Sequence, residues 1–209
     1  GRSVADVTLL AVSKTFGPGA LREAHAAGQL AFGENYVQEA LQKMADLADL
    51  PLQWHCIGPL QSNKTRPVAE HFDWVHTVDR LKIAERLAAQ RPPERPPLNV
   101  CIQVNVDGGP TKAGVAPAET LALARAVAAL PGLRLRGIMT IPEPASNFVA
   151  ARALHASARA VFDQLNAAGL ALDTLSMGMS ADLEAAVAEG STLVRVGSAI
   201  FGGRPALGA

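Results

Sequence analysis

The chain has 209 residues, 49% of them hydrophobic and 18% charged, which is the composition of a globular protein with a sizeable core. Nineteen Lys and Arg residues balance nineteen Asp and Glu residues, so the formal charge is zero. This balance argues against nucleic acid or an anionic membrane as a partner drawn in by a long-range field, and any anion site must be local. No apolar run is long enough for a membrane span and no signal peptide is visible. The two cysteines are interpreted as reduced residues, so we expect a cytoplasmic protein.

Short β-branched and apolar runs alternate with helical patterns along the chain, which is typical of repeated βα units. The expected strands are Thr8–Lys14, Leu30–Glu34, Trp54–Gly58, Trp74–Val78, Asn99–Val106, Leu135–Ile141, Thr174–Gly178 and Leu193–Ile200. The expected helices are Pro18–Ala27, Tyr36–Leu47, Lys64–His71, Arg80–Gln90, Pro117–Leu130, Val149–Ala168 and Ala181–Glu189. Eight such strands, near-continuously apolar, predict a single α/β domain over residues 1–209, a (β/α)8 TIM barrel.

The two ends of the barrel pattern do not match. Only Phe201 to Ala209 follow the eighth strand, too few residues for a helix that covers its outer face. We therefore expect the natural chain to extend upstream of Gly1 with an additional helix. The proline-rich segment 91–97 is interpreted as a stiff connection inside the domain.

Cysteines and histidines give little indication of metal or redox chemistry. Cys56 and Cys101 each lie in an apolar strand-like run, so we expect reduced core residues. The histidines lack the spacing of metal ligands, and no metal site is expected. His55 is expected near the carboxyl-terminal end of its strand, whereas the other four are interpreted as surface or hydrogen-bonded core groups: His25, His71, His76 and His155.

Lys14 is the first candidate for chemistry, because it ends the apolar run that starts at Leu9. A strand end fixes the stem of the side chain, and a partly buried amine stays neutral and nucleophilic more often than a solvated one. The simpler alternative is a strand-end lysine that reaches water. In barrels of this type the reactive groups gather at the carboxyl ends of the strands, where Asn35, Ser176 and Arg195 are also expected.

Two glycine-containing loops near the chain end are candidates for a phosphate site. The loop 197–203 follows the last strand, where such barrels often hold a phosphate with backbone amides. The segment Ser176–Ser180 adds hydroxyls ahead of an expected helix. The alternative is that these glycines only permit tight turns.

An amine, a phosphate site and the guanidinium of Arg195 together match the binding needs of pyridoxal 5′-phosphate (PLP). The lysine would form a Schiff base with the aldehyde of the cofactor, and the loops would hold its phosphate. An arginine beside the pyridine nitrogen disfavours protonation of the ring, so the bound cofactor would be a weak electron sink.

Five motifs carry a resemblance to a known family, and they span essentially the whole chain. They are Ala11–Thr15, Phe32–Glu39, Trp54–Lys64, Leu175–Ser180 and Val194–Gly202. The chain resembles the YggS/PROSC family of pyridoxal phosphate homeostasis proteins, which implies a barrel similar to the N-terminal domain of alanine racemase. It also implies a protein that stores, buffers or delivers PLP, without robust catalysis.

The resemblance assigns roles to individual residues. It implies Lys14 as the Schiff-base residue and Arg195 at the pyridine nitrogen. The phosphate residues that it implies are Ser176, Gly197 and Ser198, and the residues lining the ring are Asn35 and Met177. Ser198 stands where threonine is common, and because the hydroxyl is retained we expect phosphate binding to survive.

Two other functions stay open. An amino-acid racemase would need a second base, and Tyr36 is the only tyrosine of the chain. A barrel enzyme that forms a Schiff base with a sugar phosphate would use the same lysine and loops. Lys64, Arg66 and Lys112 are weak candidates for a second anion site or amine. We expect a monomer, with PLP-dependent apo-enzymes as recipients of the cofactor.

Overall fold

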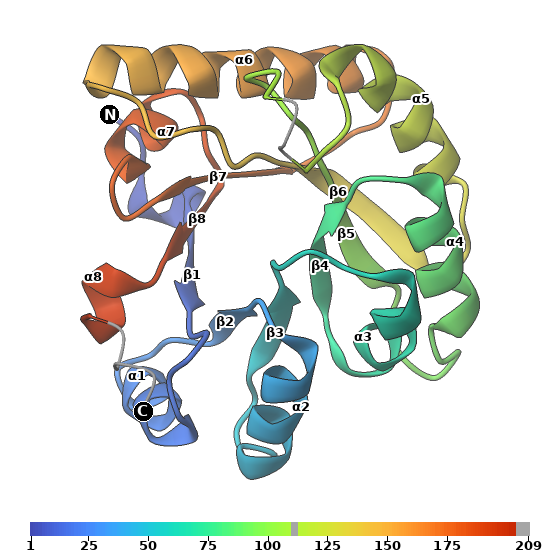
Figure 1. Cartoon of the computed structure of the whole chain (residues 1–209), viewed down its shortest axis with the longest axis vertical. Helices are drawn as coiled ribbons and strands as arrows, with labels where there is room; N and C mark the ends of the chain where they lie inside the picture. Colours follow the sequence, from blue (N-terminus) through green and yellow to red (C-terminus); the bar gives the residue numbers. More distant parts are fainter. Residues whose placement is uncertain (110–112, 204–209) are drawn as a thin grey trace.

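The computed structural model describes residues 1–109 and 113–203. Its eight strands are parallel and form a closed barrel, in which each strand pairs with its neighbours in sequence and β8 pairs with β1 (Figure 1). The predicted barrel is confirmed. The strands are β1 (Thr8–Val12), β2 (Ala31–Glu34), β3 (Gln53–Cys56), β4 (Trp74–Val78), β5 (Leu98–Gln103), β6 (Leu133–Met139), β7 (Thr174–Met179) and β8 (Leu193–Val196).

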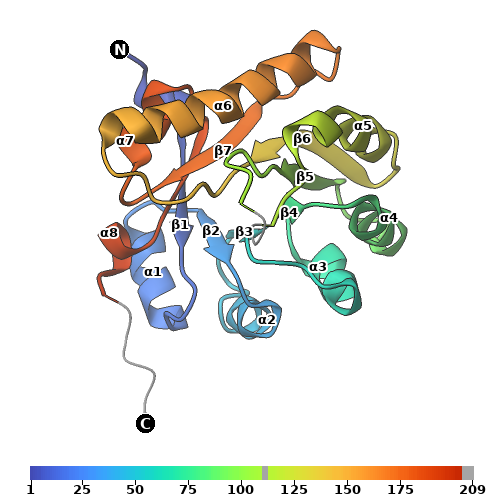
Figure 2. The same cartoon turned by 45° about the horizontal axis from the view of Figure 1, so that its top comes forward.

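Helices surround the barrel on its outside (Figures 1 and 2). They are α1 (Pro18–Ala26), α2 (Val37–Asp46), α3 (Thr65–His71), α4 (Leu81–Gln90), α5 (Pro117–Ala128), α6 (Phe148–Ala167), α7 (Leu183–Ala188) and α8 (Ser198–Phe201). Short 3-10 turns, η1 (Val4–Asp6) and η2 (Ser62–Lys64), precede β1 and α3. No helix in the two described ranges is long and apolar enough to cross a membrane.

Several strands end earlier than their sequence pattern predicts. β1 stops at Val12, because residues 13–16 form a turn in which the Phe16 amide donates to the Ser13 carbonyl at 3.1 Å. Lys14 therefore lies in a turn and not in the strand. β5 stops at Gln103 and β8 at Val196, so the strands predicted to reach Val106 and Ile200 were too long.

The end of the barrel also differs from the sequence prediction. The short helix α8 follows β8 directly, although no helix was expected there. Both views place α8 beside α1 (Figures 1 and 2), and the rings of Phe16 and Phe201 stack with their centroids 5.0 Å apart. Leu9, on the outward side of β1, is 43% exposed, so the described helices leave this part of the outer face partly open.

Alternation along the strands separates the main apolar core, outside the barrel, from a barrel interior in which buried polar residues lie beside smaller apolar clusters. Phe32, Trp54 and Cys56 belong to the main apolar cluster, together with residues of the surrounding helices. His55 and His76 are buried inside the barrel together with Ser176 and Arg195. A polar interior of this kind is stable only when its donors and acceptors are paired.

Both cysteines are free and buried, which confirms that they are core residues. Burial raises the pKa of the Cys56 and Cys101 thiols to about 12. Because the thiolate is the reactive form of cysteine, neither side chain is suited to redox or metal chemistry.

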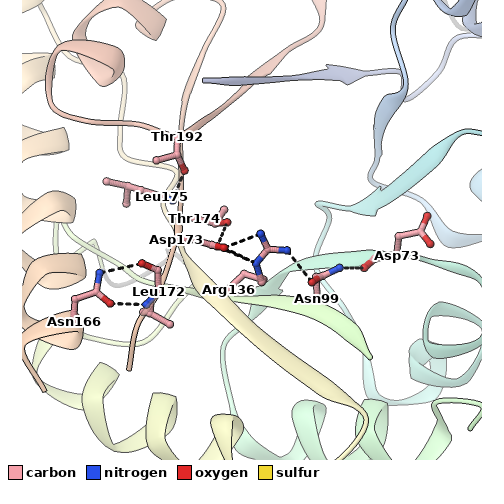
Figure 3. A network of polar contacts seen from close by, with 9 residues as sticks. All are labelled: Asp73, Asn99, Arg136, Asn166, Leu172, Asp173, Thr174, Leu175 and Thr192. Atoms are coloured by element: carbon pink, nitrogen blue, oxygen red, sulfur yellow. Dashed lines mark hydrogen bonds and ion pairs between the residues drawn. The ribbon is translucent and has the colours of Figure 1, made fainter. Parts of the chain in front are cut away.

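A polar network lies at the amino-terminal end of the barrel (Figure 3). The Arg136 guanidinium donates to both carboxylate oxygens of Asp173 at 2.9–3.1 Å and to Asn99 Oδ1 at 3.0 Å. It also lies over the ring of Trp74, 4.6 Å from the centroid. These contacts join β4, β5, β6 and the start of β7 at the mouth opposite the carboxyl ends of the strands.

Candidate functional site

A cavity of about 420 Å³ opens at the carboxyl-terminal mouth of the barrel. Five of the seven predicted site residues line it, and they come from the ends of β1, β2 and β8: Lys14, Asn35, Arg195, Gly197 and Ser198. The remaining lining residues are Val12, Phe16, Ile57, Ile141, Met179, Ser180, Ala181 and Gly202. The cavity thus combines an amine, a guanidinium, an amide and two hydroxyls with an apolar wall.

Lys14 is half-buried and occupies the second position of the turn between Ser13 and Phe16. Thr15, the next residue, has a φ of 70°, a left-handed conformation that a β-branched residue seldom adopts. Its amide donates to Glu39 Oε1 at 2.6 Å. The surrounding structure therefore holds this strained turn in one shape, which is common where a backbone presents a functional side chain.

Arg195 forms the charged floor of the cavity. It is 4% exposed, and its guanidinium donates to Ser176 Oγ and to the carbonyl oxygen of Thr140, both at 2.8 Å. Burial lowers the pKa of Arg195 to about 10, so the side chain still carries its charge at neutral pH. A buried cation at this place favours a ligand that is anionic or that presents an acceptor.

Two loops at the same mouth supply hydroxyls and backbone amides. Ser180 follows β7, and Ser198 follows β8 at the start of α8. None of the hydrogen bonds formed by the described residues uses the amides of Ser180 and Ser198 as donors. Gly178 makes the bend before Ser180, because its φ of 97° would strain other residues and a Cβ there would overlap the side chain of Ala186. This combination suits an anion.

Ser176 and Met177, the other two predicted site residues, are not among the residues that line the cavity. The Ser176 hydroxyl is buried deeper, between Arg195 and His76 Nδ1. The Met177 side chain packs outside the barrel in the apolar cluster that includes Ile102. Ser180 lines the cavity instead. The sequence analysis included it in the segment of hydroxyls after the seventh strand but assigned the site role to Ser176.

His55 does not lie where the sequence pattern placed it. It lines a cavity of about 290 Å³ at the amino-terminal mouth, together with Gln53, Trp74 and Arg136. The reason is that β3 begins at Gln53, so its second inward position is still close to the start of the strand. The prediction that His55 lies near the carboxyl ends was wrong.

Other candidates lie away from the cavity. Lys64, Arg66 and Tyr36 are not among its lining residues, and Tyr36 is 58% exposed. Lys112 lies outside the described residues. Within residues 1–109 and 113–203 no group of three or more His, Cys, Asp or Glu side chains is arranged to hold a metal ion.

Seven buried side-chain atoms lack a hydrogen-bond partner among the described residues, and one of them, Oδ1 of Asn35, belongs to a residue that lines the cavity. Another is Oγ1 of Thr140, the residue whose carbonyl oxygen accepts from the Arg195 guanidinium. Buried polar atoms without partners are rare in folded proteins. The unpaired Asn35 oxygen, on a residue that lines the cavity together with Lys14 and Ser198, fits a polar ligand with several hydrogen-bonding groups.

Comparison with known proteins defines the class first. The family model of the alanine racemase N-terminal domain matches residues 2–205. An alanine racemase of Clostridium difficile 630 is only 15% identical, yet it superposes with a TM-score of 0.80 over 97% of this chain and 54% of that chain. At this identity the likeness shows a shared fold.

Curated relatives and solved structures define the narrower group. A pyridoxal phosphate homeostasis protein of Pseudomonas aeruginosa is 64% identical over 204 residues, 98% of this chain and 87% of that protein. The protein of that name from Escherichia coli K12 is 55% identical over 98% of this chain and 88% of its own length. PipY of Synechococcus elongatus PCC7942, in a structure with PLP bound, is 44% identical, with a TM-score of 0.87 over 96% of this chain and 95% of that chain. This chain belongs to the family of pyridoxal phosphate homeostasis proteins.

Proposed function

We propose that the protein binds PLP in the carboxyl-terminal cavity and serves intracellular PLP homeostasis by storing, buffering or delivering the cofactor. The observation that carries the proposal is the convergence of Lys14, Arg195 and Ser198 on one cavity of suitable size. The name of the relatives and the PLP-bound structure of PipY support it.

The residues present fit the groups of PLP. Bound there, PLP supplies an aldehyde, which condenses with the amine of Lys14 and releases water. Gly197, Ser198 and Ser180 supply amides and hydroxyls for the phosphate. Asn35 would offer its side-chain amide to the ring, and the buried guanidinium of Arg195 would disfavour protonation of the pyridine nitrogen.

Ser180 replaces Ser176 in the phosphate site of this proposal. Ser180 lines the cavity, whereas the hydroxyl of Ser176 is engaged by Arg195 and His76. Met179 likewise replaces Met177 as the proposed residue beside the ring. Met179 lines the cavity from the end of β7, whereas Met177 packs in the apolar cluster outside the barrel.

Storage and delivery are favoured over racemisation because the cavity offers one amine and no second base among its described residues. A racemase needs a proton acceptor on each face of the substrate α-carbon. Tyr36, the only tyrosine, is exposed and does not line the cavity. We propose a PLP-dependent apo-enzyme as the recipient of the cofactor and a monomer as the oligomeric state.

The absorption spectrum of the purified protein after incubation with PLP tests the proposal. We expect a visible band that gel filtration does not remove, and after borohydride reduction a pyridoxyl group on the peptide that contains Lys14. Lys14→Ala should lose this covalent adduct. Lys82→Ala is the matched control, because Lys82 is exposed on α4, and it should keep the band.

Two further measurements separate the alternatives. Exchange of the alanine α-hydrogen in deuterated water by the loaded protein would favour a racemase. A protein that does not take up PLP, but forms a reducible adduct with a sugar phosphate at Lys14, would overturn the PLP proposal. Transfer of PLP to an apo-enzyme in the presence of an aldehyde scavenger would establish direct delivery.

A further inference from the structure

A chain of hydrogen bonds crosses the barrel interior from the cavity to the opposite mouth. Arg195 Nη1 lies 2.8 Å from Ser176 Oγ, which lies 2.9 Å from Nδ1 of His76. Nε2 of His76 lies 2.8 Å from Nδ1 of His55, whose Nε2 lies 3.0 Å from Oε1 of Gln53. The first four residues of this chain, from Arg195 to His55, come from β8, β7, β4 and β3, and each is at most 4% exposed.

The direction of this chain is fixed at its far end, because Gln53 Oε1 can only accept, so a neutral His55 carries its hydrogen on Nε2 and accepts on Nδ1. At the near end, Arg195 can only donate. Ser176 Oγ accepts from the guanidinium, and its own hydrogen is then directed to His76 Nδ1. A neutral His76 must carry its hydrogen on Nε2 and donate it to His55 Nδ1. His55 in turn carries its hydrogen on Nε2 and donates to Gln53, so every donor in the chain meets an acceptor.

Both histidines are held in the neutral form that this direction requires. Burial lowers the pKa of His55 to about 3. Burial also lowers the pKa of His76 well below its ordinary value, and the nearby His55 and Arg195 lower it further. Neutral His55 and His76 therefore add no second charge to the barrel interior, in which Arg195 is already a buried cation.

We propose that His55 and His76 are positioning residues for Arg195, which act through Ser176 to hold the guanidinium in one orientation at the floor of the cavity. The inference deepens the proposed function, on which it rests for the meaning of that orientation. A fixed guanidinium presents the same face to the pyridine nitrogen in every molecule, whereas a mobile one does not. The histidine pair contributes to the cofactor site without lining its cavity.

The unloaded protein gives the first test, which does not depend on PLP binding. Long-range ¹H–¹⁵N NMR spectra of histidine-labelled protein report the tautomer of each ring. We expect the Nε2–H tautomer for both His55 and His76, unchanged between pH 5 and 8. A hydrogen on Nδ1 of His76, or a charged ring at pH 6, would overturn the proposal.

Substitution of Ser176 gives the second test, with a control of the same type. Ser176→Ala removes the link between His76 and Arg195, whereas Ser176→Thr keeps the hydroxyl and should restore the wild-type behaviour. Ser191→Ala is the control, because Ser191 is equally buried and its hydroxyl contacts only backbone carbonyls of β7 and β8, those of Leu175, Met177 and Leu193. Both alanine variants lose stability, so stability alone does not decide.

The readouts are the visible band of the PLP-loaded protein, its pH titration and the ³¹P resonance of the bound cofactor. For Ser176→Ala we expect a shifted titration and about a tenfold weaker PLP affinity, with an unchanged ³¹P resonance. Ser191→Ala should leave all three unchanged. A moved ³¹P resonance with an unmoved band would place Ser176 at the phosphate and overturn the proposal, as would identical spectra of the two alanine variants. If wild-type protein takes up no PLP, the proposed function fails, and the tautomers still decide whether the chain exists.

Discussion

Nζ of Lys43 lies 2.8 Å from Oε1 of Glu34 and donates at the same distance to the carbonyl oxygen of Ser13, the residue before Lys14. The ammonium also donates to Glu39 Oε1, which accepts the Thr15 amide. Lys43 and Glu34 are both buried, and burial raises the pKa of Glu34 while Lys43 opposes the rise. One buried ion pair on the outside of the barrel thus clamps the turn that presents Lys14.

Replacement of Lys43 by methionine should destabilise the fold strongly. The substitution keeps most of the side-chain volume but leaves Glu34 buried without its cation, a change that costs about 3–5 kcal/mol. Urea denaturation measures the loss. Lys82→Met, at an exposed position, should stay within about 0.5 kcal/mol of wild type. Equal effects of the two substitutions would contradict the clamp.

Gly58, in the loop after β3, lies against Asn35, which follows β2 and lines the cavity. A Cβ on Gly58 would lie 2.8 Å from Cα of Asn35 and closer still to its carbonyl oxygen. Gly58→Ala should therefore displace Asn35, cost about 2–3 kcal/mol of stability and weaken PLP binding. Gly19→Ala, where nothing lies within 4 Å, should be neutral or slightly stabilising. Denaturation and PLP titration of both variants check the contrast.

The stability of the fold should decrease in mild acid because His55 stays neutral when folded. Its pKa is about 3 in the folded chain against about 6.5 when unfolded. The unfolded chain therefore binds the proton first as the pH falls. The contribution of His55 to the free energy of unfolding is fully present above pH 6.5 and is lost as the pH falls from 6.5 towards 3. At pH 5 the contribution of His55 is on the order of 2 kcal/mol.

A pair of substitutions isolates this contribution. We expect His55→Gln to lose less stability than wild type between pH 7.5 and pH 5, and His71→Gln, at an exposed position, to lose as much as wild type. Glu34 contributes with the opposite sign, since its pKa is raised, but it is present in all three proteins and cancels. Parallel stability curves for wild type and His55→Gln would show that His55 is not held neutral.

Arg136 should stabilise the amino-terminal mouth more than its exposed ion pair alone suggests. The Asp173 side chain is 53% exposed, so the pair itself contributes little. Arg136→Met also removes the contacts to Asn99 and to the face of Trp74, and we expect a loss of about 1–3 kcal/mol. Arg134→Met, two residues earlier on the same strand and exposed, is the control in the same urea titrations and should change stability by less than about 0.5 kcal/mol.

The partner of each residue across the barrel could not be read from the sequence. The pairing of β7 with β8 shifts between Ser176, opposite Leu193, and Met179, opposite Arg195. Between these two pairs, β7 advances by three residues and β8 by only two. Because of this irregularity, Ser176 lies deep in the barrel interior and Ser180 lies at the cavity. Periodicity predicts which way a side chain points, but its depth depends on the stagger between neighbouring strands.

The sequence by itself determined the βα repeats, the closed parallel barrel and the placing of Lys14, Asn35 and Arg195 at one mouth. It could do so because parallel strands bring all their carboxyl ends together, whatever the details of packing. Only the tertiary structure decided that Lys43 and Glu34 clamp the lysine turn and that His55 faces the opposite mouth. Those relationships join residues from separate elements through buried polar contacts, and no local pattern of a single strand or helix encodes such a contact.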